Sequence, residues 1–144
     1  MKRLLLIDED PRQRLLLTAF LSPHYQVEGP GPGEDPLKAA RVIRPDLALL
    51  SLHRHRPDAA LKLCRLLKTD LSPVRWVGIY GSGSGPPPEE VLGPWMADGY
   101  LGGPPNAPRL LQFLEAMGRG DQPCISPPPP PSGWLRQWVH RLTG

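Results

Sequence analysis

The sequence predicts a doubly wound α/β domain, in which helices cover both faces of a five-stranded parallel sheet. Residues 4–11 begin with four aliphatic side chains and end in three acidic residues and a proline, as a buried strand does at the carboxyl edge of such a sheet. Residues 46–50 form a second run of this kind, and strand-like and helix-like segments alternate throughout residues 1–119. We expect a proline-rich linker over residues 120–131 and a short amphipathic helix over residues 132–144.

The first strand delivers Asp8 and Glu9 to the carboxyl edge of the sheet, which is where ligands bind in open α/β folds. A helix over residues 12–21 follows the strand. Asp10 is predicted to cap this helix, because its side-chain oxygen can accept from the free N–H groups of the first turn. Pro11 suits the first helical position, where no N–H donor is needed. The acidic side chains are therefore expected at a strand-to-helix junction.

The next pair of strands encloses the second helix. A short strand is expected over residues 25–28, and the two Gly-Pro steps within residues 29–33 predict a turn after it. A helix over residues 36–43 leads to the strand of residues 46–50, and Ser51 stands at the carboxyl end of that strand. The packing face of this helix is expected to comprise Leu37, Ala40 and Val42.

The second half of the domain continues the alternation. A helix over residues 56–68 precedes a strand over residues 74–80 and a glycine- and proline-rich loop over residues 81–88. Residues 89–95 can form only a short helix, because a Gly-Pro step interrupts it, and residues 99–101 form a fifth strand. The longer helix is expected to pack through Ala60, Leu61, Cys64 and Leu67. The last helix covers residues 108–117 and is expected to pack through Leu110, Phe113, Leu114 and Met117.

The tail combines a polyproline spacer with an amphipathic pattern. Ser132 can cap a helix whose apolar side chains fall within an arc of about 140°. These side chains, the candidate partner-binding residues, are Trp134, Leu135, Trp138, Val139 and Leu142. A helix this short is marginal by itself in water, so its apolar face needs a surface. We consider three surfaces: the protein's own domain, a partner protein, and a membrane.

Three segments carry a family resemblance. They are Leu-Leu-Ile-Asp-Glu-Asp-Pro at residues 5–11, Arg-Pro-Asp-Leu-Ala-Leu-Leu-Ser-Leu at residues 44–52, and Ala-Asp-Gly-Tyr-Leu-Gly-Gly-Pro-Pro at residues 97–105. Each follows or ends an expected strand, and together they resemble the receiver domain of bacterial two-component response regulators. The resemblance covers residues 1–119 and implies the flavodoxin-like strand order 2-1-3-4-5, which the alternation of strands and helices also favours.

The resemblance implies a phosphorylation switch. In the family an acidic pair holds Mg²⁺, an aspartate at the end of the third strand accepts the phosphoryl group, and a lysine after the fifth strand contacts it. The acidic pair is present as Asp8 and Glu9, but Ser51 stands at the acceptor position and Gly103 at the lysine position. The family's hydroxyl-bearing switch residue would fall among Tyr80, Gly81 and Ser82.

These replacements weaken every step of the switch. A serine hydroxyl is a much poorer nucleophile than a carboxylate unless a base activates it, and it removes an anionic ligand from the cation site. Without the lysine, the phosphoryl group loses a charge-assisted contact of about 1.5–3 kcal/mol. We therefore predict a degenerate receiver, or pseudo-receiver, that functions as an adaptor by binding a protein partner. Two alternatives stay open: a pocket that senses a small ligand or anion through Ser51, His53 and Arg54, and a regulator still phosphorylated on Ser51.

Composition sets further expectations. The net charge of +3 comes without a nucleic-acid-reading motif, so we expect no specific nucleic-acid partner. Two cysteines without metal-ligand spacing predict free thiols, and no catalytic constellation, metal site or cofactor motif is recognised. The absence of a signal sequence or membrane span predicts a cytoplasmic protein. A homodimer is a further expectation, and the single asparagine with abundant proline and arginine is compatible with a thermophile or a GC-rich genome.

Overall fold

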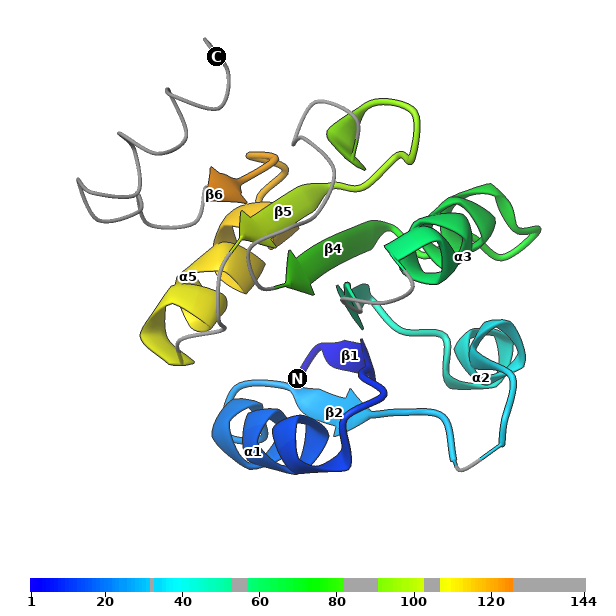
Figure 1. Ribbon diagram of the computed structural model, residues 1–144. Coiled ribbons are helices and arrows are strands. Elements are labelled where there is room, and N and C mark those ends of the chain that lie inside the picture. Colours follow the sequence, from blue (N-terminus) through cyan, green and yellow to red (C-terminus); the bar gives the residue numbers. More distant parts are fainter. Residues whose placement is uncertain (32, 53–56, 82–90, 103–106, 126–144) are drawn as a thin grey trace, which may run out of the picture.

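The computed structural model describes residues 1–31, 33–52, 57–81, 91–102 and 107–125, and Figure 1 shows their arrangement. The strands are β1 (Arg3–Ile7), β2 (Gln26–Glu28), β3 (Leu47–Ser51), β4 (Trp76–Gly81), β5 (Gly99–Gly102) and β6 (Cys124–Ile125). The helices are α1 (Pro11–Leu21), α2 (Pro36–Ile43), α3 (Pro57–Thr69) and α5 (Ala107–Gly118). The expected tail helix, residues 132–144, lies outside the described residues.

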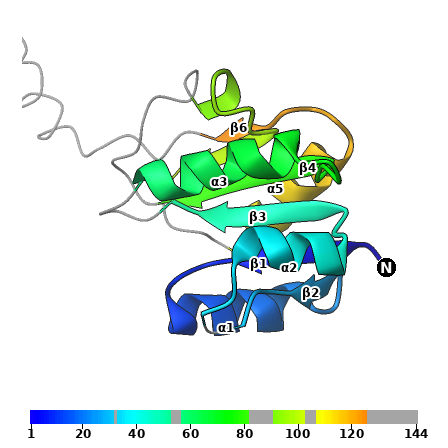
Figure 2. The same cartoon turned by 90° about the vertical axis from the view of Figure 1, so that its right-hand side faces the viewer.

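The strands form one parallel sheet in the order β2-β1-β3-β4-β5-β6. The first five positions confirm the predicted order 2-1-3-4-5. The register aligns Leu6 of β1 with Leu49 of β3, and Ser51 at the end of β3 with Tyr80 of β4. Because all strands run the same way, their carboxyl ends share one edge, and β3 points toward this edge at the left of Figure 2.

The sixth strand was not predicted. β6 pairs with β5 through Tyr100 opposite Cys124, and the Tyr100 N–H group donates to the Pro123 carbonyl at 2.9 Å. These residues were expected to belong to the linker of residues 120–131, and for β6 that prediction is wrong. A two-residue strand beside prolines shows no periodicity, so its pairing depends on tertiary contacts that the sequence pattern does not carry.

Helices cover both faces of the sheet and divide the apolar interior into two clusters. Figure 1 shows α1 and α5 on one side of the sheet and α2 and α3 on the other. Phe113 and Tyr80 lie in the cluster on the α1 and α5 side, and Cys64 and Ile79 lie in the cluster on the α2 and α3 side. The predicted packing faces of α3 and α5 are confirmed, because their expected apolar side chains are all buried.

The packing face of α2 was predicted incorrectly at one position. Val42 is 81% exposed, whereas Ala39 is buried beside Ala40. Positions 39, 40 and 43 share one side of a helix, while position 42 lies about 200° from position 40 and faces solvent. Arg44 then ends the helix with a positive φ of 52°.

Helix caps agree with the sequence pattern. The Asp10 carboxylate accepts from the Arg12 N–H group at 3.0 Å, as predicted, and the Asp35 carboxylate accepts from the Leu37 N–H group at 3.1 Å. Apart from β6, each observed strand and helix lies within two residues of its expected bounds at both ends, where the structure describes it. Of the short helix expected at residues 89–95, the described part is helical at residues 91–92 and forms a turn over residues 93–95.

Two glycines allow α5 to lie close to the sheet. A Cβ atom at Gly78 would stand 2.9 Å from both the Met117 sulfur and a ring carbon of Phe113, and one at Gly99 would stand 2.9 Å from the same ring. The aromatic ring thus fills the space that side chains on β4 and β5 would otherwise occupy. Among the described residues, no helix is both long enough and apolar enough to span a bilayer.

Candidate functional site

Asp8 is the one buried charged side chain among the described residues. It follows β1 at the carboxyl edge of the sheet and is 5% exposed. The aliphatic residues of β1 hold the chain in the interior up to Ile7, and the start of α1 at Pro11 fixes the direction in which the chain leaves. The strand-to-helix junction predicted from the sequence therefore places this carboxylate in the protein rather than in solvent.

Two hydrogen bonds satisfy the Asp8 carboxylate. The Tyr80 hydroxyl group donates to Oδ2, and the main-chain N–H group of Asp10 donates to Oδ1 at 2.9 Å. Arg14 donates from Nη1 to the main-chain carbonyl of Asp8 at 3.4 Å, which anchors the first turns of α1 to the same loop. Hydrogen bonds to an ionised carboxylate are among the strong ones in proteins, so this arrangement stabilises a charge that burial alone would disfavour.

Tyr80 reaches the acidic residue from the neighbouring part of the sheet. It belongs to β4, is 1% exposed, and packs in the cluster that includes Leu49 and Leu101. Burial raises the pKa of the Tyr80 hydroxyl group far above its ordinary value, and the negative charge and hydrogen bond of Asp8 raise it further. The phenol is therefore a permanent proton donor to Asp8 across the physiological pH range.

Ser51 lies beside this pair. It ends β3, and the register pairs it with Tyr80, whose carbonyl accepts from the Leu52 N–H group at 2.7 Å. A hydrogen bond with the Ser51 side chain lowers the pKa of Tyr80, and so offsets part of the increase caused by burial and by Asp8. Of the three residues considered for the switch position, Tyr80 is thus the one that stands opposite Ser51, whereas Gly81 carries no hydroxyl group and Ser82 lies outside the described residues.

The structure brings together three of the predicted site residues. Asp8, Glu9 and Ser51 line one pocket at the carboxyl edge. Gly103, His53 and Arg54 are outside the described residues, as are all five apolar residues predicted to bind a partner through the tail. Arg14 was not among the residues predicted for the site, although its position one turn into α1, six residues after Asp8, is a signal that could have suggested it.

The residues present do not fit the Mg²⁺ site that the family resemblance implies. Mg²⁺ requires a near-octahedral set of oxygen ligands and usually keeps several waters. Here a phenol hydroxyl group already bonds to one oxygen of Asp8, and the neutral Ser51 stands where the family has an aspartate. Within residues 1–31, 33–52, 57–81, 91–102 and 107–125, no group of three His, Cys, Asp or Glu side chains could hold a metal ion.

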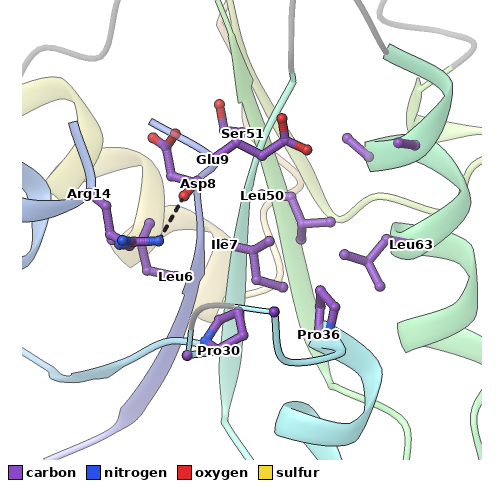
Figure 3. Close-up of a pocket in the computed structure, with 14 residues that line it drawn as sticks. Leu6, Ile7, Asp8, Glu9, Arg14, Pro30, Pro36, Leu50, Ser51 and Leu63 are labelled. Carbon is purple, nitrogen blue, oxygen red and sulfur yellow. Dashed lines mark hydrogen bonds between the residues drawn. The ribbon is translucent and has the colours of Figure 1, made fainter. Parts of the chain in front are cut away.

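A pocket of about 420 Å³ extends from the acidic residues toward α2 and α3. Figure 3 shows Asp8, Glu9 and Ser51 at one end, and Ile7, Leu50, Leu63 and Pro36 along the walls. The remaining walls come from Ala59 and Ala60 of α3 and from the segment around Pro30 and Gly31. This volume is within the range of clefts that hold small ligands or large side chains. The sequence predicted a pocket at Asp8, Glu9 and Ser51 but not its apolar walls, because the lining comes from four separate parts of the chain.

No protein-family model and no curated protein sequence matches the chain. Solved structures do match. The chemotaxis protein CheY4 of Vibrio cholerae has a TM-score of 0.70 at 19% identity, and the alignment covers 81% of this chain and 98% of that one. An orphan response regulator of Helicobacter pylori gives a TM-score of 0.65 at 21% identity, covering 82% of this chain and 97% of that one.

A third structure is similar at somewhat higher identity. It is a response regulator receiver modulated diguanylate cyclase from Pelobacter carbinolicus, with a TM-score of 0.62 at 27% identity, and the alignment covers 85% of this chain and 95% of that one. The chain therefore has the fold of response-regulator receiver domains, as the three sequence segments predicted.

Proposed function

We propose that this receiver-fold domain is a pseudo-receiver, which takes part in bacterial signalling without being phosphorylated and acts as an adaptor that binds a protein partner. The observation that carries the proposal is the hydrogen bond from the buried Tyr80 hydroxyl group to Asp8. It gives the carboxylate a built-in partner at the point where the family binds its cation. A cation would have to displace a buried donor before it could bind.

The acceptor position supports the same conclusion. The Ser51 hydroxyl group would need a general base to act as a nucleophile, and the adjacent tyrosine cannot serve, because its raised pKa keeps it protonated. Asp8 is already engaged with Tyr80 and Asp10. Neither Tyr80 nor Asp8 is therefore placed to activate Ser51, and the residues of the site do not fit the cation that phosphoryl transfer from a small phosphodonor uses.

The adaptor role is supported by an exposed apolar face on α1. Leu15 is 72% exposed and Leu16 is 70% exposed, and the exposed Ala19 continues the stripe at helical spacing. The helix buries Leu17 and Leu21 on the opposite side, so it is apolar on two faces. Adjacent leucines on the outside of a helix are typical of an interface with another protein or with a second copy of the chain.

Phosphorylation is tested by incubating the protein with Mg²⁺ and acetyl phosphate and measuring its intact mass. We expect no added phosphoryl group under conditions that label a receiver domain with a complete acidic site. Stoichiometric labelling of Ser51 would refute the proposal and support the alternative of a regulator still phosphorylated on that residue. Mass spectrometry of the protein from its own cells would extend the test to enzymatic phosphodonors.

The interaction surface is tested by affinity capture from native lysate. The double variant Leu15→Ser/Leu16→Ser is compared with wild type and with Leu71→Ser, which changes a fully exposed leucine in another part of the surface. We expect a partner that wild type and Leu71→Ser retain and the double variant loses. Equal capture by all three would place the interface elsewhere, and a comparison with the chain shortened to residues 1–119 would then examine the tail.

The second hypothesis, a pocket that senses a small ligand, is supported by the volume of the cleft. Its described lining holds the carboxyl groups of Asp8 and Glu9 against the single guanidinium of Arg14, which favours a cationic ligand over an anion. The predicted contacts His53 and Arg54 lie outside the described residues. Thermal stabilisation by a metabolite that the variant Arg54→Ala no longer shows would favour this hypothesis over the adaptor.

A further inference from the structure

The pocket has the chemistry of a peptide-binding cleft. Its walls are aliphatic and proline side chains from β1, β3, α2 and α3, while the exposed Glu9 stands at its rim on the carboxyl edge and Asp8 is buried behind it. Such a cleft suits a segment with large apolar side chains on one face and an arginine beside them. The apolar walls would exclude water from the inserted side chains, and the Glu9 carboxylate would favour a basic residue at the mouth.

We propose that the occupant is the C-terminal segment of this same chain, residues 132–144, which docks in the pocket through its apolar helical face. The proposal does not depend on whether the domain is phosphorylated, because it concerns the contents of the cleft rather than the chemistry of Ser51. Three independent features lead to it: the edge at which the chain leaves the sheet, the length of the spacer, and the side chains at its end.

The sheet directs the tail to the correct edge. β6 is parallel to β5, so the chain passes Cys124 and Ile125 in the same direction as β1 and β3 and leaves the sheet at the carboxyl edge. The pocket opens at this edge, next to the ends of β1 and β3. An antiparallel last strand would have sent the tail to the opposite edge, away from the pocket.

The spacer has the length that the distance requires. Neighbouring strands lie about 4.8 Å apart, so the three to four spacings from β6 to β3 and β1 amount to about 14–19 Å. Residues 126–131 are one serine and five prolines. In the polyproline II conformation these six residues span about 19 Å, at about 3.1 Å each. The helix would therefore begin above the pocket, and the stiffness of the spacer lowers the entropic cost of docking.

The end of the chain matches the cleft in chemistry. Trp134 and Trp138 are four residues apart and lie on one face of a helix, so both can enter an apolar cleft together. Arg136 and Arg141 flank this face, and either can approach the Glu9 carboxylate at the rim. Because the segment is tethered, its effective concentration at the pocket is of the order of millimolar, which makes even a weak contact populated.

The test is limited proteolysis of the full-length chain, because trypsin cuts after Arg136 and Arg141. The tail-cleavage rate is measured by intact mass and divided by the rate of cleavage within residues 1–119, so that a general loss of stability does not count. Wild type is compared with Trp134→Ala/Trp138→Ala and with Gln137→Ala, a change on the polar side of the same helix. We expect the tryptophan double variant to be cut about tenfold faster than wild type, and Gln137→Ala at the wild-type rate.

A second pair of variants tests the pocket. Ala59→Trp fills the cleft from α3, and Lys62→Trp adds the same side chain to an exposed position of α3 outside the cleft lining. We expect faster tail cleavage in Ala59→Trp and the wild-type rate in Lys62→Trp. If the tryptophan double variant is cut faster and Ala59→Trp is not, the tail docks on a different surface and the pocket assignment is wrong.

A further measurement uses no pocket variant, so its result does not depend on whether Ala59→Trp folds correctly. Amide hydrogen exchange of the full-length chain is compared between wild type and Trp134→Ala/Trp138→Ala. We expect slower exchange at residues 7–9 and 59–63 in wild type. Identical exchange at these residues, or a protection that rises with protein concentration and therefore comes from a second copy, would overturn the proposal.

Discussion

Tyr80→Phe is the substitution that examines the acidic site most directly. It removes the hydroxyl group that donates to Asp8 Oδ2 and keeps the aromatic ring that packs in the interior. The buried carboxylate then retains the Asp10 N–H group as its described donor at 2.9 Å. Because the lost hydrogen bond is made to a charged group, we expect the free energy of unfolding to fall by about 1.5–3 kcal/mol.

Urea denaturation at pH 7 measures this loss. The control is Tyr100→Phe, which removes a hydroxyl group from a second buried tyrosine of the sheet, in the other apolar cluster. A double-mutant cycle of Tyr80→Phe with Asp8→Asn should give a coupling energy of about 1 kcal/mol or more, because the two side chains are in direct contact. If Tyr80→Phe costs no more than Tyr100→Phe and shows no coupling to Asp8, the hydrogen bond does not hold the site and our reasoning is refuted.

Three further predictions follow from single features of the fold. Iodoacetamide at pH 8 should alkylate the exposed Cys124 within minutes and leave Cys64 unmodified. Cys64 is fully buried, and burial is the main cause that raises its pKa to about 12. Equal alkylation rates for the two cysteines would contradict the packing of α3. Because the pKa of Cys64 is 9.0 in the unfolded chain and about 12 in the folded protein, the unfolded chain loses this proton at lower pH. The free energy of unfolding should therefore fall from pH 9 toward pH 12, by up to about 1.4 kcal/mol per pH unit from this group. Urea denaturation of Cys64→Ala should show a shallower decline over the same range. Gly78→Ala should cost about 1–3 kcal/mol in urea denaturation through overpacking against Phe113, whereas Gly118→Ala, whose Cβ atom would meet nothing nearer than 3.6 Å, should be neutral or stabilising; equal effects would contradict the close approach of α5.

Much of the fold could be predicted from the sequence because local signals agreed with one another. Aliphatic runs, an aspartate with a following proline before α1, and glycine–proline turns all led to the same alternation of strands and helices. Failures occurred where tertiary contacts decide the structure. β6 is too short to show a pattern, and Val42 was assigned to the wrong side of a short helix whose buried face is made by alanines.

The acidic site was predictable in part. The strand ends placed Asp8, Glu9 and Ser51 together, since the carboxyl ends of parallel strands meet at one edge. The sequence could not choose Tyr80 over its neighbours, because that choice depends on the register between β3 and β4. Nor could it show that the tyrosine hydroxyl group reaches across β3 to Asp8, the residue that follows β1, because this contact depends on how three adjacent strands are aligned.

The hydrogen-bonded acidic site explains why a receiver fold with Asp8 and Glu9 in place need not operate as a phosphorylation switch. In such a site the buried carboxylate always has the tyrosine hydroxyl group as its partner, whereas a cation would be its partner only while bound. Under the proposed function, a domain built in this way would present one fixed surface to a partner. Control of the interaction would then come from the availability of other surfaces, including the pocket proposed to receive the tail.

The most direct test of this account is a titration of the protein with beryllofluoride and Mg²⁺, followed through the amide NMR signals near Ser51. Beryllofluoride mimics a phosphoryl group on a receiver aspartate, and its binding needs both the acceptor carboxylate and the cation. We predict no saturable shift of the signals around Asp8, Ser51 and Tyr80. A saturable shift of these signals at stoichiometric beryllofluoride would show that the site still binds the cation and the phosphoryl mimic, and it would contradict the assignment as a pseudo-receiver.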